Sequence, residues 1–352
     1  MSSTPSISSD PVAVPRSSVQ AGPVERRASA RVRPETLATS AVFIACAVLL
    51  GLTRLVIPGF GGAQQLATIV ALASFLIVVA YGQGLVVLIG GLDLSMPSVL
   101  TLGGVLAAGW IGANGELSAW SYVAALGLCA GVGAINGIGV TWLRVPAFIM
   151  TLASGVVVYS LCLGATSGSP SGSAPPALRA LMQGHVGAVP AAVLFALVFV
   201  ALAWFCQSRT VFGRQLAALG ANPRAAHIAG LRVSALTVGA YAACATCAGW
   251  AGMMLVGYSN GATLRMGDAY LLPSIAAVVI GGSSIFGGRG SYLGTVGGAL
   301  LLTILSMIIT SLGMPQGWRT LIEGGVILLA LLLMQDRVLE AARRVLQRSR
   351  QR

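Results

Sequence analysis

Long apolar stretches separated by short polar ones run through most of this 352-residue chain. Because a helix needs about 20 apolar residues to cross a bilayer, the pattern predicts an all-α polytopic membrane protein with about ten transmembrane helices. Gly133 and Gly137, one helical turn apart in the fourth of them, predict close helix packing. The expected spans are residues 37–57, 65–81, 94–113, 117–141, 147–165, 186–206, 233–256, 269–282, 292–312 and 317–334.

Both ends of the chain lack this apolar character. Residues 1–36 are rich in Ser, Pro and Arg and predict a disordered tail, and residues 336–352 form a basic tail. Residues 37–335 between them are the expected membrane domain. The first apolar run is too long for a cleaved signal sequence, so it predicts a retained first span. An even number of spans that starts inside places both tails in the cytoplasm.

The composition supports a membrane protein, because 56% of the residues are hydrophobic and 9% are charged. Soluble domains carry about 25% charged residues. The net charge of +12 comes from arginine alone, and the arginines gather in both tails and in the loops expected on the inner side. This bias follows the positive-inside rule, so the charge does not require a nucleic-acid partner.

Residues 209–232 form a polar interruption that carries four arginines and no acid. The segment has a helical pattern with many alanines and glycines, and its charge places it in the cytoplasm. In it, Asn222 is expected to cap a short helix that has Pro223 in its first turn. Two interpretations stay open, an ordinary loop between helices and a docking element for a cytoplasmic partner.

Two apolar segments are interrupted. Residues 84–91 are broken by glycines before Asp93, and residues 269–282 are short for a span. Both have Gly and Asp ahead of Pro-Ser at the start of a membrane segment, with a one-residue offset, which predicts two inverted repeats of five helices. Asp93 or Ser95 either caps the following helix or lines or gates a pathway, and Asp268 has the same two interpretations.

The sequence offers no catalytic, cofactor or metal site. Cys244 and Cys247 have a CxxC spacing without a second pair or a nearby His, so they are expected to be buried apolar residues. A P-loop requires Lys, which this chain lacks. The glycines in residues 281–290 therefore predict a tight cytoplasmic turn rather than a phosphate cradle.

Three stretches together resemble the membrane permease subunits of ribose-type ABC sugar importers. Residues 90–95 (Gly-Gly-Leu-Asp-Leu-Ser) are similar to a Gly-Gly-Ile-Asp-Leu-Ser signature. Residues 213–230 resemble the cytoplasmic coupling segment of the family, and residues 276–291 resemble its late motif. The resemblance covers roughly residues 40–335.

The resemblance implies a permease that forms a homodimer or heterodimer with a second permease copy in the bacterial inner membrane. A cytoplasmic ABC ATPase, which holds ATP and Mg²⁺, and a periplasmic substrate-binding protein would be its partners, and this chain itself would bind no cofactor. The implied ATPase-coupling residues are Gly213, Arg214, Gly220, Asn222, Ala225, Ala226 and Gly230. The candidate residues for lining or gating the substrate path are Asp93, Ser95, Asp268, Ser283 and Ser284.

The function expected from this reading is import of a monosaccharide such as ribose or xylose by alternating access, with the energy supplied by the partner. The absence of nucleotide motifs agrees with a separate ATPase, so the chain is not expected to be an enzyme. One alternative is an ion-coupled secondary transporter that works alone and uses Asp93 or Asp268 as its coupling acid. A second is the same permease type with a non-sugar cargo, such as a nucleoside or an amino acid.

Overall fold

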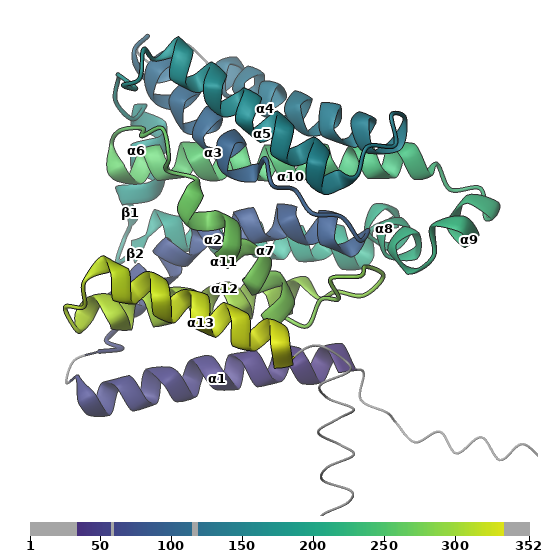
Figure 1. The fold of residues 1–352 in the computed structure, drawn as a ribbon. Coiled ribbons are helices and arrows are strands. Elements are labelled where there is room, and N and C mark those ends of the chain that lie inside the picture. The colour runs from purple at the N-terminus through teal and green to yellow at the C-terminus, as the bar shows by residue number, and fades with distance from the viewer. Residues whose placement is uncertain (1–33, 58–59, 115–118, 334–352) are drawn as a thin grey trace, which may run out of the picture. The chain divides into compact units, whose positions relative to one another are not determined.

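The computed structural model describes residues 34–57, 60–114 and 119–333, and nearly all of its regular structure is helical (Figure 1). Residues 34–36 of the expected N-terminal tail belong to the first helix. The rest of that tail and the basic C-terminal tail lie outside the described residues. The first half contains α1 (Pro34–Val56), α2 (Ala63–Leu88), α3 (Met96–Val105), the π-helical η1 (Leu106–Gly112), α4 (Ala119–Thr141) and α5 (Ala147–Ala165).

The second half begins with the short α6 (Pro176–Gln183) and a hairpin of two-residue strands. Strands β1 (His185–Val186) and β2 (Val189–Pro190) pair antiparallel, with His185 opposite Pro190. The remaining elements are α7 (Ala191–Arg209), α8 (Val211–Ala221), α9 (Pro223–Ile228), α10 (Val233–Ser259), the 3₁₀-helical η2 (Asp268–Tyr270), α11 (Leu271–Ile280), α12 (Tyr292–Ser311) and α13 (Gln316–Leu333).

Seven of the described helices are long and apolar enough to cross a membrane, namely α1, α2, α4, α5, α7, α10 and α12. Each of the ten expected spans overlaps a helix, but several boundaries were wrong. The hairpin occupies the start of the expected span 186–206, so α7 begins only at Ala191. The expected break at residues 84–91 was placed too early, because α2 continues to Leu88. Its Gly82 permits contact with α10, since an added Cβ would lie 2.8 Å from Cys244 Cα.

Helices α2 and α10 form the centre of the bundle. In the α2 span 78% of the residues are buried inside the bundle, whereas in the spans of α1 and α7 the buried share is 17% each. Helix α10 packs against α2, α3 and α4. Its approach to α4 uses the two glycines noted in the sequence, because a Cβ on Gly133 would collide with the carbonyl oxygen of Tyr241, and one on Gly137 would lie 2.5 Å from Val238 Cα. The prediction of close packing at these glycines is confirmed.

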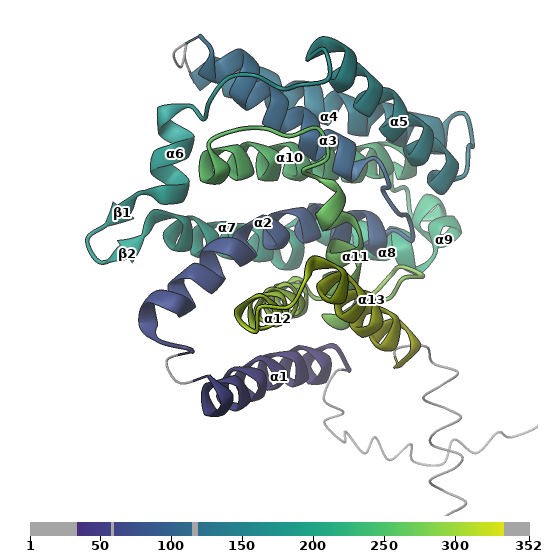
Figure 2. The same ribbon diagram turned by 60° about the vertical axis from the view of Figure 1, so that its left-hand side comes forward.

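Each central helix is followed by an interrupted segment. After α2, residues 89–95 are non-helical and run back along the bundle before α3 begins at Met96 (Figures 1 and 2). After α10, residues 260–267 are non-helical, and η2 and α11 follow. The first segment packs against α4, α5 and α10, and the second packs against α2, α12 and α13. The irregular backbone of the first segment includes the buried Asp93 and Ser95, whereas residues 260–267 are mostly half-buried or exposed.

Helix α1 lies at the edge of the bundle, where it packs against α12 (Figure 2). The Cys46 thiol donates a hydrogen bond to the carbonyl oxygen of Gly297, at 3.6 Å, and Cys46 packs in a cluster with Ile69 and Ile304. The contact joins segments about 250 residues apart in the sequence, so the start of the described chain is fixed by an element close to its end.

Candidate functional site

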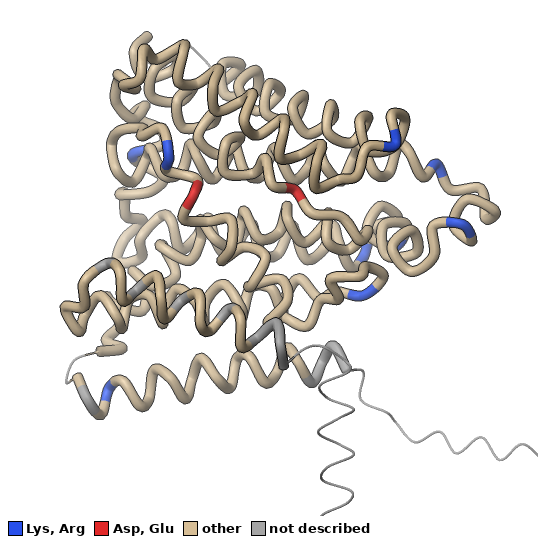
Figure 3. Tube along the Cα trace, in the orientation of Figure 1, with Lys and Arg blue, Asp and Glu red and all other residues tan. Residues whose placement is uncertain are grey.

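The described arginines lie at the two ends of the bundle, and both acidic positions drawn in Figure 3 lie between them. One end includes the loops that join α4 to α5, α7 to α10 and α11 to α12. We call it the arginine-rich end, and its described arginines are Arg144, Arg209, Arg214, Arg224, Arg232 and Arg289, all of them exposed. The expected coupling segment, residues 209–232, forms α8 and α9 at this end (Figure 1).

Side-chain caps define the two short helices of the coupling segment. The hydroxyl of Thr210 accepts a hydrogen bond from Gly213 N–H at the start of α8, at 3.4 Å. The amide oxygen of Asn222 accepts from Ala225 N–H at the start of α9, at 3.1 Å, and Pro223 is the first residue of α9. The predicted cap and proline are confirmed, but the segment holds two helices where the sequence suggested one.

The other expected coupling residues divide between packing and surface positions. Gly213 is buried against the end of α7, where a Cβ would collide with the carbonyl oxygen of Gln207. Ala226 is buried and Ala225 is exposed. Arg214 donates a hydrogen bond to the carbonyl oxygen of Arg209 at 3.0 Å. Gly230 follows α9, and its N–H donates to the carbonyl oxygen of His227 at 2.9 Å.

Gly220 lies at a contact between three separate parts of the chain. The N–H of Gly288, in the turn after α11, donates to the carbonyl oxygen of Leu88, the last residue of α2, at 2.8 Å. A Cβ on Gly220 would collide with this carbonyl oxygen and would lie 2.6 Å from Gly288 N. We call Leu88, Gly220 and Gly288 the backbone junction. It connects the coupling segment to the end of α2, just before the first interrupted segment, and to the turn that follows α11.

Asp93 is fully buried in a polar cluster inside the bundle. Its Oδ1 accepts hydrogen bonds from the N–H and the hydroxyl of Ser95, and Asn136 of α4 donates to that hydroxyl at 2.9 Å. Ser95 therefore bonds to Asp93 and makes no side-chain cap of α3, although Pro97 does lie in the first turn of α3 as expected. The cluster holds the irregular backbone in place.

Polar side chains from several helices complete this cluster. Thr151 of α5 accepts from Leu94 N–H at 3.1 Å. Gln83 of α2 pairs with the main-chain N–H and carbonyl of Asp93 at 3.3 Å, in the amide orientation that satisfies both. Asp93 Oδ2, Asn136 Oδ1 and Tyr241 Oη are buried and find no hydrogen-bond partner within the described part of the chain. Three of these residues, Gln83, Asn136 and Tyr241, were not predicted from the sequence, although an amide inside an apolar span indicates a functional or structural role.

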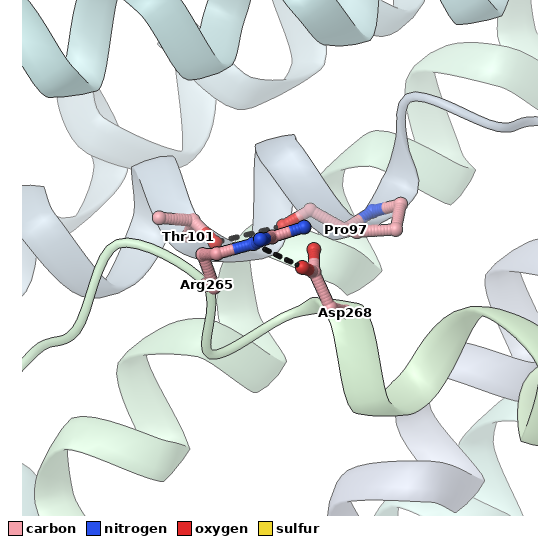
Figure 4. Close-up of polar contacts among 4 residues, drawn as sticks. All are labelled: Pro97, Thr101, Arg265 and Asp268. Carbon is pink, nitrogen blue, oxygen red and sulfur yellow. Dashed lines mark hydrogen bonds and ion pairs between the residues drawn. The ribbon is translucent and has the colours of Figure 1, made fainter.

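Asp268 has a different environment. Its Oδ2 accepts from Arg265 Nε at 2.7 Å, and the two side chains are 52% and 78% exposed, respectively. Figure 4 shows this pair beside Pro97 and Thr101 in the first turns of α3. The loop approaches α3 closely, because a Cβ on Gly267 would collide with the carbonyl oxygen of Pro97.

The expected path residues do not share one set of contacts. Asp93 and Ser95 belong to the buried polar cluster, and Asp268 pairs with Arg265. Ser283 and Ser284 lie in the turn after α11, where Ser284 N–H donates to the carbonyl oxygen of Arg289 at 2.9 Å. The three sequence stretches of the resemblance do meet beside the backbone junction. An added Cβ on Gly287 would lie 2.8 Å from Gly90 N and 3.1 Å from the carbonyl oxygen of Gly220.

Several long apolar helices around two interrupted segments, with arginines at the ends, define a multi-pass α-helical membrane protein. Residues 65–331 match the family model described as "Branched-chain amino acid transport system / permease component". The chain belongs to this permease family and is a multi-pass protein of the inner membrane. It is a transport component rather than a catalytic enzyme.

Among its relatives, the ribose import permease protein RbsC of Escherichia coli K12 is 35% identical over 295 residues, 82% of this chain and 91% of that protein. RbsC of Haemophilus influenzae is 30% identical over 294 residues, 82% of this chain and 91% of the relative. The galactose/methyl galactoside import permease protein MglC of Treponema pallidum is 32% identical over 200 residues, 54% of this chain and 38% of the relative. No solved structure matches. The resemblance to permeases of ribose-type sugar importers is confirmed.

Proposed function

We propose that this chain is the membrane subunit of an ATP-driven, binding-protein-dependent importer for a monosaccharide. The relatives named as ribose and galactose import permeases support a sugar cargo. The observation that carries the mechanism is the backbone junction, where the coupling segment contacts the end of α2, just before the first interrupted segment, and the turn that follows α11. A push on α8 from a partner ATPase would therefore reach the interior of the bundle through main-chain contacts.

The proposal includes a topology. Ten segments cross the membrane, the arginine-rich end faces the cytoplasm together with both termini, and the two halves are inverted repeats of five segments. The packing supports the repeat, because α2 contacts α11 and α12 while α10 contacts α3 and α4. The same pattern joins α3 to α5 and α11 to α13. The positive-inside rule supports the orientation.

The partners follow from this function. A cytoplasmic ATPase with its ATP and Mg²⁺ docks on α8 and α9, a periplasmic binding protein delivers the substrate at the opposite end, and a second permease copy completes the transporter. Asp93, Ser95, Asp268, Ser283 and Ser284 remain candidates for gating or lining the path. The family description also names branched-chain amino acid transport, so an amino acid is the second candidate cargo.

The docking role is tested on exposed residues, because a side chain at Gly220 would collide with the carbonyl oxygen of Leu88 and disturb the fold. A candidate ABC ATPase and a candidate substrate-binding protein from the same organism are purified and combined with this chain in nanodiscs. We expect Ala225→Trp to weaken ATPase binding by at least about tenfold, since it alters the centre of the docking surface. The control is Ala180→Trp on α6. Ala180 is also exposed, but α6 lies at the end of the bundle opposite α8 and α9 (Figure 1).

Transport assays on the same preparation decide between the function classes. We expect uptake of labelled ribose or galactose to require the ATPase, ATP and the binding protein. Uptake by the permease alone under a proton gradient would contradict the proposal and favour the ion-coupled transporter. Amino-acid uptake without sugar uptake would keep the mechanism and change the cargo.

A further inference from the structure

Residues 284–289 form a tight turn at the arginine-rich end. Gly287 N–H donates to the carbonyl oxygen of Ser284 at 3.1 Å, and Ser284 N–H donates to the carbonyl oxygen of Arg289 at 2.9 Å. Gly287 and Gly288 have φ angles of 86° and 78°, in the left-handed region that favours glycine. The turn is therefore held by its own hydrogen bonds and by residues suited to its backbone.

The two central residues of this turn are apolar and exposed. Ile285 is 39% exposed and Phe286 is 91% exposed. Central turn positions usually carry Gly, Pro, Asn, Asp or Ser, for which the backbone or a side-chain hydrogen bond gives a reason. Neither reason applies to Ile or Phe. A phenylalanine that is covered by a partner buries about 150–250 Å², so an exposed one on a fixed turn is suited to an interface.

The turn is also fixed relative to the coupling segment. Besides the bond from Gly288 to Leu88, a Cβ on Gly288 would lie 2.7 Å from Ala221 Cα, and one on Gly287 would lie 3.1 Å from the carbonyl oxygen of Gly220. Ala221 is the last residue of α8, and α9 follows after one residue. Phe286 therefore stands on the same backbone framework as the proposed docking helices, so its position is set before any partner arrives.

We propose that Ile285 and Phe286 form an apolar knob that inserts into an apolar pocket on the partner ATPase, as a second contact beside α8 and α9. This inference rests on the proposed function. On α9 itself, Ile228 is 86% exposed and offers the partner a separate apolar contact. The matching pocket is expected to have an acidic rim, because the knob lies at the arginine-rich end and three residues before the exposed Arg289.

Charge supports this occupant. Within residues 34–57, 60–114 and 119–333, the described ion pair joins Arg265 to Asp268, and neither belongs to the arginine-rich end. Arg224, Arg232 and Arg289 are exposed there. A bilayer surface also attracts arginine and phenylalanine, but insertion into lipid does not require a side chain on a fixed turn packed against α8. Preorganised backbone and complementary charge together favour a protein pocket.

The test compares two phenylalanines at the same end of the bundle. Phe148, in the first turn of α5, is 58% exposed and serves as the matched control. Binding of the purified ATPase to the permease in nanodiscs is measured for Phe286→Ala, Phe148→Ala and the unchanged chain. We expect Phe286→Ala to weaken binding by about 10- to 100-fold, as expected for an aromatic hot spot, and Phe148→Ala to leave it unchanged. Equal affinity of all three would overturn the inference.

A fluorescent variant separates the protein pocket from the membrane. In Phe286→Trp, made in a chain whose six native tryptophans are replaced by Phe, we expect little quenching by brominated lipids. We also expect a blue shift of the emission when the ATPase binds, because the indole enters an apolar site. Strong quenching by the lipids that does not change with ATPase would show a membrane anchor and would also overturn the inference.

The inference and the proposed function can fail separately. If Ala225→Trp abolishes ATPase binding while Phe286→Ala does not, the docking role of α9 stands and the second contact is lost. If the ATPase does not bind the unchanged chain at all, the proposed function fails together with the inference. The two proposals are supported together if Ala225→Trp and Phe286→Ala both lose ATPase binding while the controls Ala180→Trp and Phe148→Ala bind normally.

Discussion

The two interrupted segments place the same residue types in opposite environments. In the first, Asp93 precedes α3 and is enclosed by polar groups of α2, α4 and α5. In the second, Asp268 begins η2 and forms an exposed pair with Arg265. Similar spacing of Asp and Pro thus marks a similar local break in the helix. The neighbouring helices, rather than the local sequence, decide whether the acid becomes part of the core.

The difference has an energetic consequence. A buried carboxyl whose hydrogen bonds are removed leaves other buried groups without partners, and each such group costs about 1–3 kcal/mol. An exposed ion pair gains little, because water solvates both charges and salt screens them. The first interrupted segment should therefore be sensitive to changes in its acid, and the second should be sensitive mainly to changes in its packing.

The largest effect is expected at Asp93. Asp93→Ala removes the acceptor of two hydrogen bonds from Ser95, so we expect the free energy of unfolding to fall by about 3 kcal/mol and transport to be lost. Asp93→Asn keeps an acceptor oxygen in the same place and is expected to retain much of both. Heat unfolding and ATP-driven uptake in proteoliposomes provide the measurements. If the Asn variant were as stable as the unchanged chain but inactive, the charge itself would be required.

A smaller effect is expected at Gly267, where the second interrupted segment touches the first. A methyl group there collides with the carbonyl oxygen of Pro97, so Gly267→Ala is expected to cost about 1–3 kcal/mol. Gly261 in the same loop has no atom within 4 Å of an added Cβ, and Gly261→Ala is the control. The midpoints of heat unfolding should differ between the two variants. Equal midpoints would show that the loop shifts without cost.

The smallest effect is expected at the ion pair of Arg265 and Asp268. Because both side chains are more than half exposed, a double-mutant cycle with Arg265→Ala and Asp268→Ala should give a coupling energy of about 0.5 kcal/mol or less. The cycle is measured by chemical unfolding at low and at high salt. A much larger coupling would mean that the pair is shielded from water in the assembled transporter. Loss of uptake in Asp268→Ala at normal stability would support a gating role.

Much of the fold could be predicted because the bilayer imposes its thickness on the apolar pattern. The positions of the long spans, the cap at Asn222 and the close packing at Gly133 and Gly137 follow from local rules. The cap at Thr210 was not predicted. The end of α2 could not be predicted, because a glycine in an apolar run can either interrupt a helix or allow close packing. Gly82 lies inside the continuous α2 and packs against α10. Glycine spacing alone does not distinguish these uses.

The candidate site could be predicted only in part for a related reason. The coupling segment was evident from its charge and small residues, and Asp93 from its place beside an apolar span. The backbone junction was not, because Leu88, Gly220 and Gly288 are distant in sequence and their contact is made by main-chain atoms. Phe286 was missed for another reason, since an apolar residue in an apolar chain attracts notice only once its exposure is known.

The contact between α1 and α12 has a consequence for biosynthesis. A ribosome adds about 5–20 residues per second, so α1 emerges some tens of seconds before its partner is made. During that interval the face of α1 that will meet α12 must be covered by lipid or by the insertion machinery. Final assembly of the described helices therefore waits for α12, and α1, the first of them to be synthesised, is among the last to find its place.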